Sequence, residues 1–126
     1  MQALIIDDSK VMRSILRRIV DDLGFEAAEA AHGQEAIEHL EAGLQPDLCL
    51  IDWNMPVMDG YSFVSAVRKN PEWRNITLMM VTTESSHDQI VKALAAGAHE
   101  YVIKPFTADA IAEKLELLGL TTGVVA

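Results

Sequence analysis

The residues best suited to chemistry in this sequence follow short apolar runs. The run Leu48–Ile51 ends at Asp52, and a turn rich in Asn, Pro and Gly comes next. Four consecutive apolar residues before such a turn are typical of a buried parallel strand. Ligands of open α/β sheets bind at the carboxyl ends of the strands. Asp52 is therefore the first functional candidate, and an Asp that merely starts a turn is the alternative.

Three other apolar runs also end in residues of useful chemistry. These are Asp7 and Asp8 after residues 3–6, Thr82 after residues 77–81, and Lys104 after residues 100–103. Between the runs, apolar residues recur at three- and four-residue spacing, which predicts amphipathic helices. Expected strands occupy residues 3–6, 25–30, 48–51, 77–81 and 100–103, and expected helices occupy residues 9–23, 34–42, 61–69, 86–96 and a segment after Thr107.

Five β-α units in this length predict an α/β fold, a doubly wound five-stranded parallel sheet with five flanking helices. The flavodoxin-like strand order 2-1-3-4-5 is the usual arrangement, and it places the first and third strands side by side. Asp7, Asp8 and Asp52 would then converge in one crevice, with Thr82 and Lys104 on its far side. The sequence thus predicts an acidic site at one edge of the sheet.

Three neighbouring carboxylates repel one another unless a cation compensates them. Oxygen ligands suit Mg²⁺ better than zinc, which prefers His or Cys. The four histidines, at positions 32, 39, 87 and 99, have no metal-binding spacing, and we expect them to be surface or incidental residues. The basic residues of the first expected helix, among them Arg13 and Arg17, are expected to form a solvated face.

A carboxylate at a metal and opposite a lysine can receive a phosphoryl group. Lys104 would supply positive charge and Thr82 a hydroxyl donor. Asp52 would be the attacking carboxylate and would form an acyl phosphate. Since Asp8 is followed by Ser-Lys and no Gly-rich phosphate loop is present, the phosphoryl group must come from a donor other than bound ATP.

Composition restricts the partners. The net charge of -9 argues against nucleic acid or an anionic membrane surface and favours a metal ion or another protein. The single cysteine, Cys49, lies inside an apolar run, where a small buried hydrophobe is expected. The N-terminus has neither a signal peptide nor a long apolar run, so a cytoplasmic protein of one domain is predicted.

These residues resemble the receiver domains of two-component response regulators along essentially the whole chain. The signature positions are matched by Asp7, Asp8, Asp52, Thr82 and Lys104-Pro105-Phe106. Within that family the chain is most similar to single-domain chemotaxis regulators, through residues 52–56, 58–60, Glu84, Tyr101 and 104–107. The resemblance implies a phosphorylation-activated switch that catalyses only its own phosphorylation and dephosphorylation.

The resemblance also implies a role for each site residue. Asp52 would accept a phosphoryl group from a sensor histidine kinase, and Lys104 would contact it, with Lys104-Pro105 in the cis form. Mg²⁺ would be held by Asp8, Asp52 and the backbone carbonyl of Asn54, with Asp7 supporting the metal through its shell.

Switching would involve two further positions. The phosphoryl group would draw in Thr82, and Tyr101 would turn inward, which changes the surface of the fourth helix, fifth strand and fifth helix where partners bind. Asn54 and Glu84 would set the rate of hydrolysis. Thr83 departs from the family pattern, in which a small residue follows the switch hydroxyl, so the phosphoryl lifetime and access of a phosphatase are left open.

Several alternatives are retained. A non-chemotaxis pathway such as a phosphorelay would use the same residues, and a degenerate receiver would have lost Lys104 or an acidic residue. A Mg²⁺-dependent aspartyl-phosphate phosphatase of the haloacid dehalogenase type would have a second Asp where Asn54 stands.

We expect a receiver domain at residues 1–119, a short tail at 120–126 and no output domain. The protein is expected to be a monomer whose target is another protein, with a flagellar motor switch as one candidate.

Overall fold

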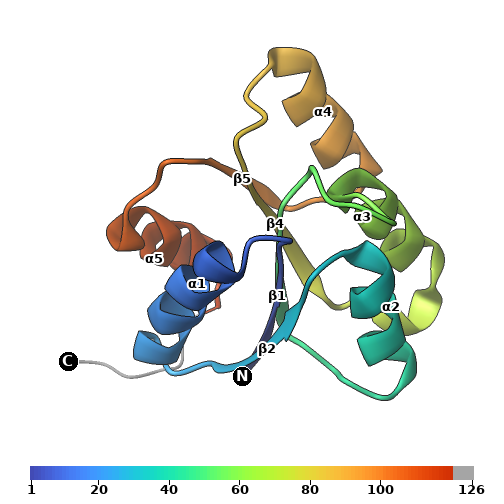
Figure 1. The fold of residues 1–126 in the computed structure, drawn as a ribbon, viewed down its shortest axis with the longest axis horizontal. Helices are drawn as coiled ribbons and strands as arrows, with labels where there is room; N and C mark the ends of the chain where they lie inside the picture. The colour runs from blue at the N-terminus through green and yellow to red at the C-terminus, as the bar shows by residue number, and fades with distance from the viewer. Residues whose placement is uncertain (121–126) are drawn as a thin grey trace.

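A parallel β-sheet lies between two layers of helices in the computed structural model, which describes residues 1–120 (Figure 1). The strands are β1 (Gln2–Ile6), β2 (Glu26–Ala30), β3 (Leu48–Ile51), β4 (Thr77–Thr82) and β5 (Glu100–Ile103). The helices are α1 (Lys10–Asp22), α2 (Gly33–Glu41), α3 (Gly60–Lys69), α4 (His87–Ala96) and α5 (Ala108–Leu117), with a short 3₁₀ helix, η1 (Pro71–Trp73), before β4. Helices α1 and α5 cover one face of the sheet, and α2, α3 and α4 cover the other.

The strand order is β2-β1-β3-β4-β5, which confirms the predicted flavodoxin-like arrangement. Ile6 of β1 pairs with Ile51 of β3, and Ile51 pairs with Met80 of β4. Because these strands are in parallel register, the residues that follow them emerge at the same edge of the sheet. Asp7 and Asp52 are therefore level with each other.

Alternate residues of each strand fill two hydrophobic cores, one on each side of the sheet. Leu4 and Ile6 face the core beneath α2, α3 and α4, whereas Ala3 and Ile5 face the core beneath α1 and α5. Cys49 is fully buried in the first core, and burial raises the pKa of its thiol. The prediction that Cys49 acts as a small buried hydrophobe is confirmed. Within the described residues, no helix combines the length and the apolar character needed to cross a membrane.

The bounds of most expected elements differ from the observed ones by one residue at an end, and two differences from the sequence predictions have a clear physical cause. Helix α2 begins one residue earlier than expected, at Gly33, because the Nδ1 atom of His32 accepts the backbone N–H of Glu35 at 3.1 Å and caps the helix. His99 is also structural, since its Nδ1 accepts the N–H of Leu78 at 3.1 Å where β4 begins. The interpretation of these two histidines as incidental was wrong, because a side chain can replace a missing backbone acceptor.

Arg68 of α3 joins the elements at the amino ends of β4 and β5. Its guanidinium donates to the backbone oxygens of Gly97 at 3.0 Å, Arg74 at 3.2 Å and Ile76 at 3.0 Å. These carbonyls lie just after α4, just after η1 and just before β4. One planar group with five N–H donors thus satisfies three carbonyls that have no strand or helix partner nearby.

We predict that Arg68→Lys lowers the free energy of unfolding by about 2–3 kcal/mol, because a single ammonium cannot reach three divergent carbonyls. Chemical denaturation of the purified protein measures this change. Arg18→Lys, the same substitution on the exposed side of α1, is the control. Equal stability of the two variants would contradict the role given to Arg68.

Candidate functional site

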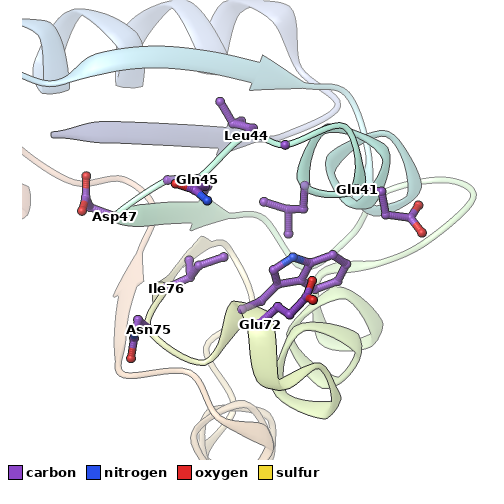
Figure 2. A pocket seen from close by; sticks show the side chains of 11 residues that line it. Glu41, Leu44, Gln45, Asp47, Glu72, Asn75 and Ile76 are labelled. Carbon is purple, nitrogen blue, oxygen red and sulfur yellow. The ribbon is translucent and has the colours of Figure 1, made fainter.

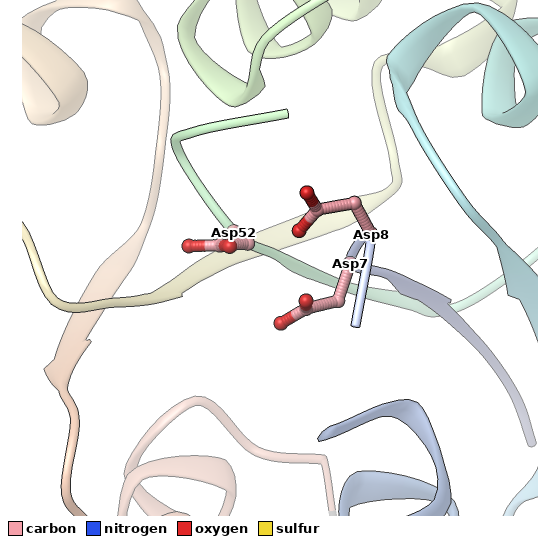
Figure 3. A group of neighbouring side chains, drawn as sticks. All are labelled: Asp7, Asp8 and Asp52. Atoms are coloured by element: carbon pink, nitrogen blue, oxygen red, sulfur yellow. The ribbon is translucent and has the colours of Figure 1, made fainter. Parts of the chain in front are cut away.

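Three aspartates meet at the carboxyl ends of β1 and β3 (Figure 3). One carboxylate oxygen each of Asp7, Asp8 and Asp52 lies within 4.8 Å of the other two. Asp7 is 1% exposed and Asp52 is 9% exposed, whereas Asp8 is open to solvent. The structure therefore brings together the three acidic residues that the sequence analysis selected, in a crevice that water and ions can enter.

Lys104 approaches the same carboxylates from the end of β5. Its Nζ lies 2.9 Å from Oδ2 of Asp7 and 3.6 Å from Oδ2 of Asp52. The backbone N–H of Lys104 donates to the Thr82 carbonyl at 2.8 Å, which extends the pairing of β4 with β5 and fixes where the side chain starts. The Lys104-Pro105 peptide bond is cis, as the resemblance implied.

Opposing effects act on the pKa of the Asp52 carboxyl. Burial raises this pKa, and the nearby charge of Asp7 raises it further, while the Lys104 ammonium and the Thr82 hydroxyl act in the opposite direction. The backbone N–H of Trp53 also donates to Oδ1 of Asp52 at 2.8 Å. The charged carboxylate is thus incompletely compensated, and an added cation would stabilise it.

Asp7 is already engaged by the protein. Its Oδ1 accepts the backbone N–H of Ser9 at 2.9 Å, and its Oδ2 contacts Lys104. Asp8 and Asp52 are consequently the carboxylates best able to bind an added ion directly. An all-oxygen set that is open to water on one side fits Mg²⁺, which retains several waters when it binds to proteins.

The loop after Asp52 returns to β3 at a glycine. The N–H of Gly60 donates to the Trp53 carbonyl at 2.9 Å, and a Cβ atom at this position would overlap the backbone carbonyl of Asp52. Asp59 then caps α3 by accepting the N–H of Ser62 at 2.8 Å. The close return of the chain, which only glycine permits, keeps the residues after Asp52 at the mouth of the crevice.

The remaining predicted site residues form one hydrogen-bonded group around the β4–α4 loop. Thr82 is fully buried, and its Oγ1 accepts the Glu84 N–H at 3.3 Å. The Tyr101 hydroxyl donates to the Glu84 carbonyl at 2.6 Å, and Nδ2 of Asn54 donates to Oε1 of Glu84 at 2.7 Å. Tyr101 is 9% exposed and already points inward without a phosphoryl group, so the inward turn that the resemblance implied on phosphorylation is not needed to reach this position. Glu84 therefore links the loops that follow β3 and β4 with β5.

A basic contact beside the site was missed by the sequence analysis. Arg13 and Arg17 were expected to form a solvated face, but both bind the Glu29 carboxylate, at 3.0 and 2.6 Å. The hydrogen bond from Arg17 holds the pKa of Glu29 below its usual range. Arg13 also donates to the Asp7 carbonyl at 2.8 Å, so it buttresses the acidic site. Two features of the sequence could have indicated this contact. Glu29 is a charged residue inside an expected strand, and Arg13 and Arg17 are four residues apart on the first expected helix.

A second hollow lies at the opposite, amino-terminal edge of the sheet (Figure 2). It has a volume of about 510 Å³ and is lined by residues that include Leu40, Glu41, Asp47, Glu72 and Trp73. None of the eleven described residues that line it is a lysine or arginine. An acidic hollow without a cation does not suit a phosphoryl group, so the crevice at Asp52 remains the candidate site.

The fold and the acidic crevice define a class of signalling domain, and comparison with known proteins identifies it. The family model for the response regulator receiver domain matches residues 3–116. The chain therefore belongs to the response regulator receiver domain family.

Within this family, the chain is similar to chemotaxis proteins. The chain is 43% identical to the chemotaxis protein CheY of Pseudomonas aeruginosa, covering 92% of this chain and 94% of the relative. It is 40% identical to the chemotaxis protein CheY1 of Helicobacter pylori, covering 94% and 96%. The expected similarity to chemotaxis regulators is confirmed.

Solved structures agree with the fold. The structure of CheY4 of Vibrio cholerae matches with a TM-score of 0.85 at 33% identity, covering 92% of this chain and 96% of that one. The receiver domain of the sensor histidine kinase PA1611 of P. aeruginosa matches with a TM-score of 0.83 at 25% identity, covering 92% and 94%. The latter structure is described with a magnesium ion coordinated in its active site cleft.

We predict that Lys104→Met lowers the free energy of unfolding by about 2–4 kcal/mol in buffer without divalent cations, because two buried carboxylates lose their counter-charge. Added Mg²⁺ is expected to stabilise this variant more than it stabilises the original protein, since the ion no longer competes with the ammonium. Thermal or denaturant unfolding with EDTA and with Mg²⁺ measures both effects. Lys69→Met, on an exposed position of α3, is the control, and equal behaviour of the two variants would refute the assigned role.

Proposed function

We propose that this protein is a phosphorylation-activated signalling switch that receives a phosphoryl group on Asp52 from a sensor histidine kinase. The carrying observation is that Lys104 lies between the carboxylates of Asp7 and Asp52 at the meeting of three strand ends. Membership of the receiver family supports this proposal. The protein is then its own catalyst for phosphorylation and dephosphorylation and acts on no separate substrate.

In the proposed transfer, a carboxylate oxygen of Asp52 attacks the phosphorus of a phosphohistidine. The new O–P bond forms as the P–N bond breaks, and the imidazole leaves with the bonding electrons and takes up a proton. The Lys104 ammonium neutralises charge on the phosphoryl oxygens, and the backbone fixes its position. Hydrolysis later releases phosphate when a water oxygen attacks the phosphorus and the Asp52 carboxylate leaves.

A magnesium ion is proposed as the cofactor. Asp8 and Asp52 would bind it with the backbone carbonyl of Asn54, and Asp7 would support it through its contacts. When bound, Mg²⁺ supplies positive charge that neutralises the carboxylates and the transferring phosphoryl oxygens. The oxygen-only donor set of the crevice supports this choice of metal.

The phosphoryl group would act on the partner surface through Thr82 and Tyr101. A new charge with strong acceptors shifts an equilibrium only through contacts that differ between the two states. The Thr82 hydroxyl is proposed to move toward the phosphoryl oxygens. Glu84 would follow because its N–H donates to the Thr82 hydroxyl, and Tyr101 would follow because its hydroxyl donates to the Glu84 carbonyl. The surface of α4, β5 and α5 would change, and it carries exposed apolar side chains at Val91, Leu94 and Ile103.

The proposed partners are a sensor histidine kinase and a downstream protein in chemotaxis, with a flagellar motor switch as the candidate target. The names of the CheY relatives support this pathway. Asn54 and Glu84 are proposed to tune hydrolysis, because their hydrogen bond spans the mouth of the crevice. We propose residues 1–119 as the receiver unit; the expected tail, 120–126, lies outside the described residues except for Leu120.

A small acyl phosphate donor tests the central step. We expect a single Mg²⁺-dependent phosphoryl addition by intact mass on the original protein. Asp52→Asn, which removes the nucleophile and keeps the side-chain volume, is expected to abolish the addition. Asp59→Asn is the control, since Asp59 caps α3 outside the crevice. Phosphoryl addition to Asp52→Asn at the original rate would refute the assignment.

A second test separates phosphorylation from switching. We predict that Thr82→Ala keeps the phosphoryl addition but loses most of the phosphorylation-dependent change in amide hydrogen exchange over α4 and β5, because the hydroxyl that links them is gone. Ser85→Ala, in the same loop and exposed, is the control and is expected to keep that change. An intact exchange response in phosphorylated Thr82→Ala would contradict the role of the hydroxyl.

A further inference from the structure

Helix α4 is attached unevenly to the domain. Ala93 is its single buried residue, whereas α3 buries Gly60, Phe63, Val64 and Val67. In Figure 1, α4 stands at the end of the molecule beside α3. A helix with so little buried surface depends on a few individual contacts for its position.

The carboxyl end of α4 is held firmly. The helix ends at Gly97, whose φ of 125° is a conformation that favours glycine, and whose carbonyl accepts Nε of Arg68 at 3.0 Å. A Cβ atom at Gly97 would overlap the Arg68 side chain. Arg68 therefore fixes this end of α4 and leaves the amino end, nearer the crevice, as the end that can move.

The amino half of α4 carries an unsatisfied group. Among the described residues, Oε1 of Gln89 is buried with no hydrogen-bond donor. A buried acceptor without a donor is costly, and a small displacement of α4 that exposes it to water removes that cost.

One contact opposes that displacement. Nζ of Lys92, on α4, lies 4.3 Å from the centre of the Tyr61 ring on α3. The Tyr61 ring in turn stacks on Trp53, with centroids 5.8 Å apart and an angle of 14° between the planes. Trp53 follows Asp52 directly, and its backbone N–H donates to Asp52 Oδ1 at 2.8 Å. A chain of contacts therefore runs from the proposed phosphoryl acceptor to α4.

We propose that Tyr61 and Lys92 are positioning residues that latch α4 in the unphosphorylated arrangement and couple its position to Asp52 through Trp53. This inference rests on the proposed function. It adds a route separate from that of Thr82 and Tyr101, because it leaves the crevice along α3 and not along β4 and β5.

The latch responds to phosphorylation through the hydrogen bond between Trp53 and Asp52. A carboxylate accepts a stronger hydrogen bond than an uncharged oxygen does. Conversion of Asp52 into an acyl phosphate removes the carboxylate charge, so the bond from the Trp53 N–H weakens and the Trp53–Tyr61 stack is free to shift. The Lys92 contact is then lost or lengthened, and α4 is released at its amino end.

Linkage fixes the direction of the mutational effect. If the latch favours the unphosphorylated arrangement of α4, its removal favours the arrangement that the phosphoryl group stabilises. A cation–π contact at an exposed site corresponds to roughly a two- to fivefold shift in an equilibrium. Lys92→Met, which keeps the length of the side chain and removes its charge, is therefore expected to exchange the α4 amides about two- to fivefold faster without any phosphoryl donor.

The same variant is expected to show a larger phosphorylated fraction of Asp52 at a limiting concentration of a small acyl phosphate with Mg²⁺. Lys92→Arg restores the cation and is expected to restore both values. Lys69→Met removes the same charge from an exposed position of α3 and is expected to change neither. Intact mass and hydrogen exchange of the full chain provide the two readouts.

A double-mutant cycle separates a latch from two unrelated effects. Tyr61→Leu and Lys92→Met are expected to be non-additive, since either one breaks the same contact. Tyr61→Phe keeps the ring and is expected to behave as the original protein, and the unfolding midpoint of Tyr61→Leu shows whether that variant is folded.

Three results would overturn the proposal. Additive effects would refute the Tyr61–Lys92 contact as a unit, and Lys92→Met equal to Lys69→Met in exchange would refute the latch. Faster exchange with an unchanged phosphorylated fraction would refute its coupling to Asp52. If the original protein takes up no phosphoryl group, the proposed function fails and the coupling with it, while the exchange data still decide whether Lys92 holds α4.

Discussion

The structure of the site depends on one partly buried ammonium group placed between two buried carboxylates. Lys104 can reach both Asp7 and Asp52 only because β1 lies next to β3, and because β5, paired with β4, continues beyond the level at which β1 and β3 end. Removal of a charge from water is costly unless a partner of opposite sign is close. The strand order and register are therefore requirements of the charge balance as much as of the hydrophobic cores. A shift of one strand by one residue would turn its end residue to the other face of the sheet.

Most of the fold and the acidic site could be predicted because they depend on local patterns. Continuous apolar runs marked β3 and β4, polar residues marked their ends, and right-handed crossovers left few possible strand orders. The site then followed from topology alone. Strand β2 was the weakest prediction, since its sequence of Glu and Ala has no buried run, and its place comes from pairing with β1 along its whole length. Tertiary pairing here outweighs strand propensity.

The contacts that escaped prediction are those that one side chain makes to distant backbone or charge. Arg68 reaches three carbonyls in separate loops, and Arg13 joins α1 to β2 and to the backbone of Asp7. An arginine on a helix has the same sequence signature whether it faces water or spans a gap, because its length permits both. Only the relative placement of the helices decides between the two. Sequence patterns therefore identify the groups that carry charge at the site but not the groups that support them.

The charge balance of the crevice bears on how the Glu84 loop and α4 would respond to a change at Asp52. Three carboxylates and one ammonium leave two negative charges, which a single divalent cation balances. Under the proposed function, phosphorylation of Asp52 would upset that balance, because it would add charge beyond the carboxylate while Asp7 stays buried and paired with Lys104. The parts able to adjust are the Glu84 loop, held by individual hydrogen bonds, and α4, which buries only Ala93. The buried acidic residues are held rigidly, whereas the Glu84 loop and α4 are held by few contacts. A change of charge at Asp52 would therefore move the loop and α4 and alter the surface that they form.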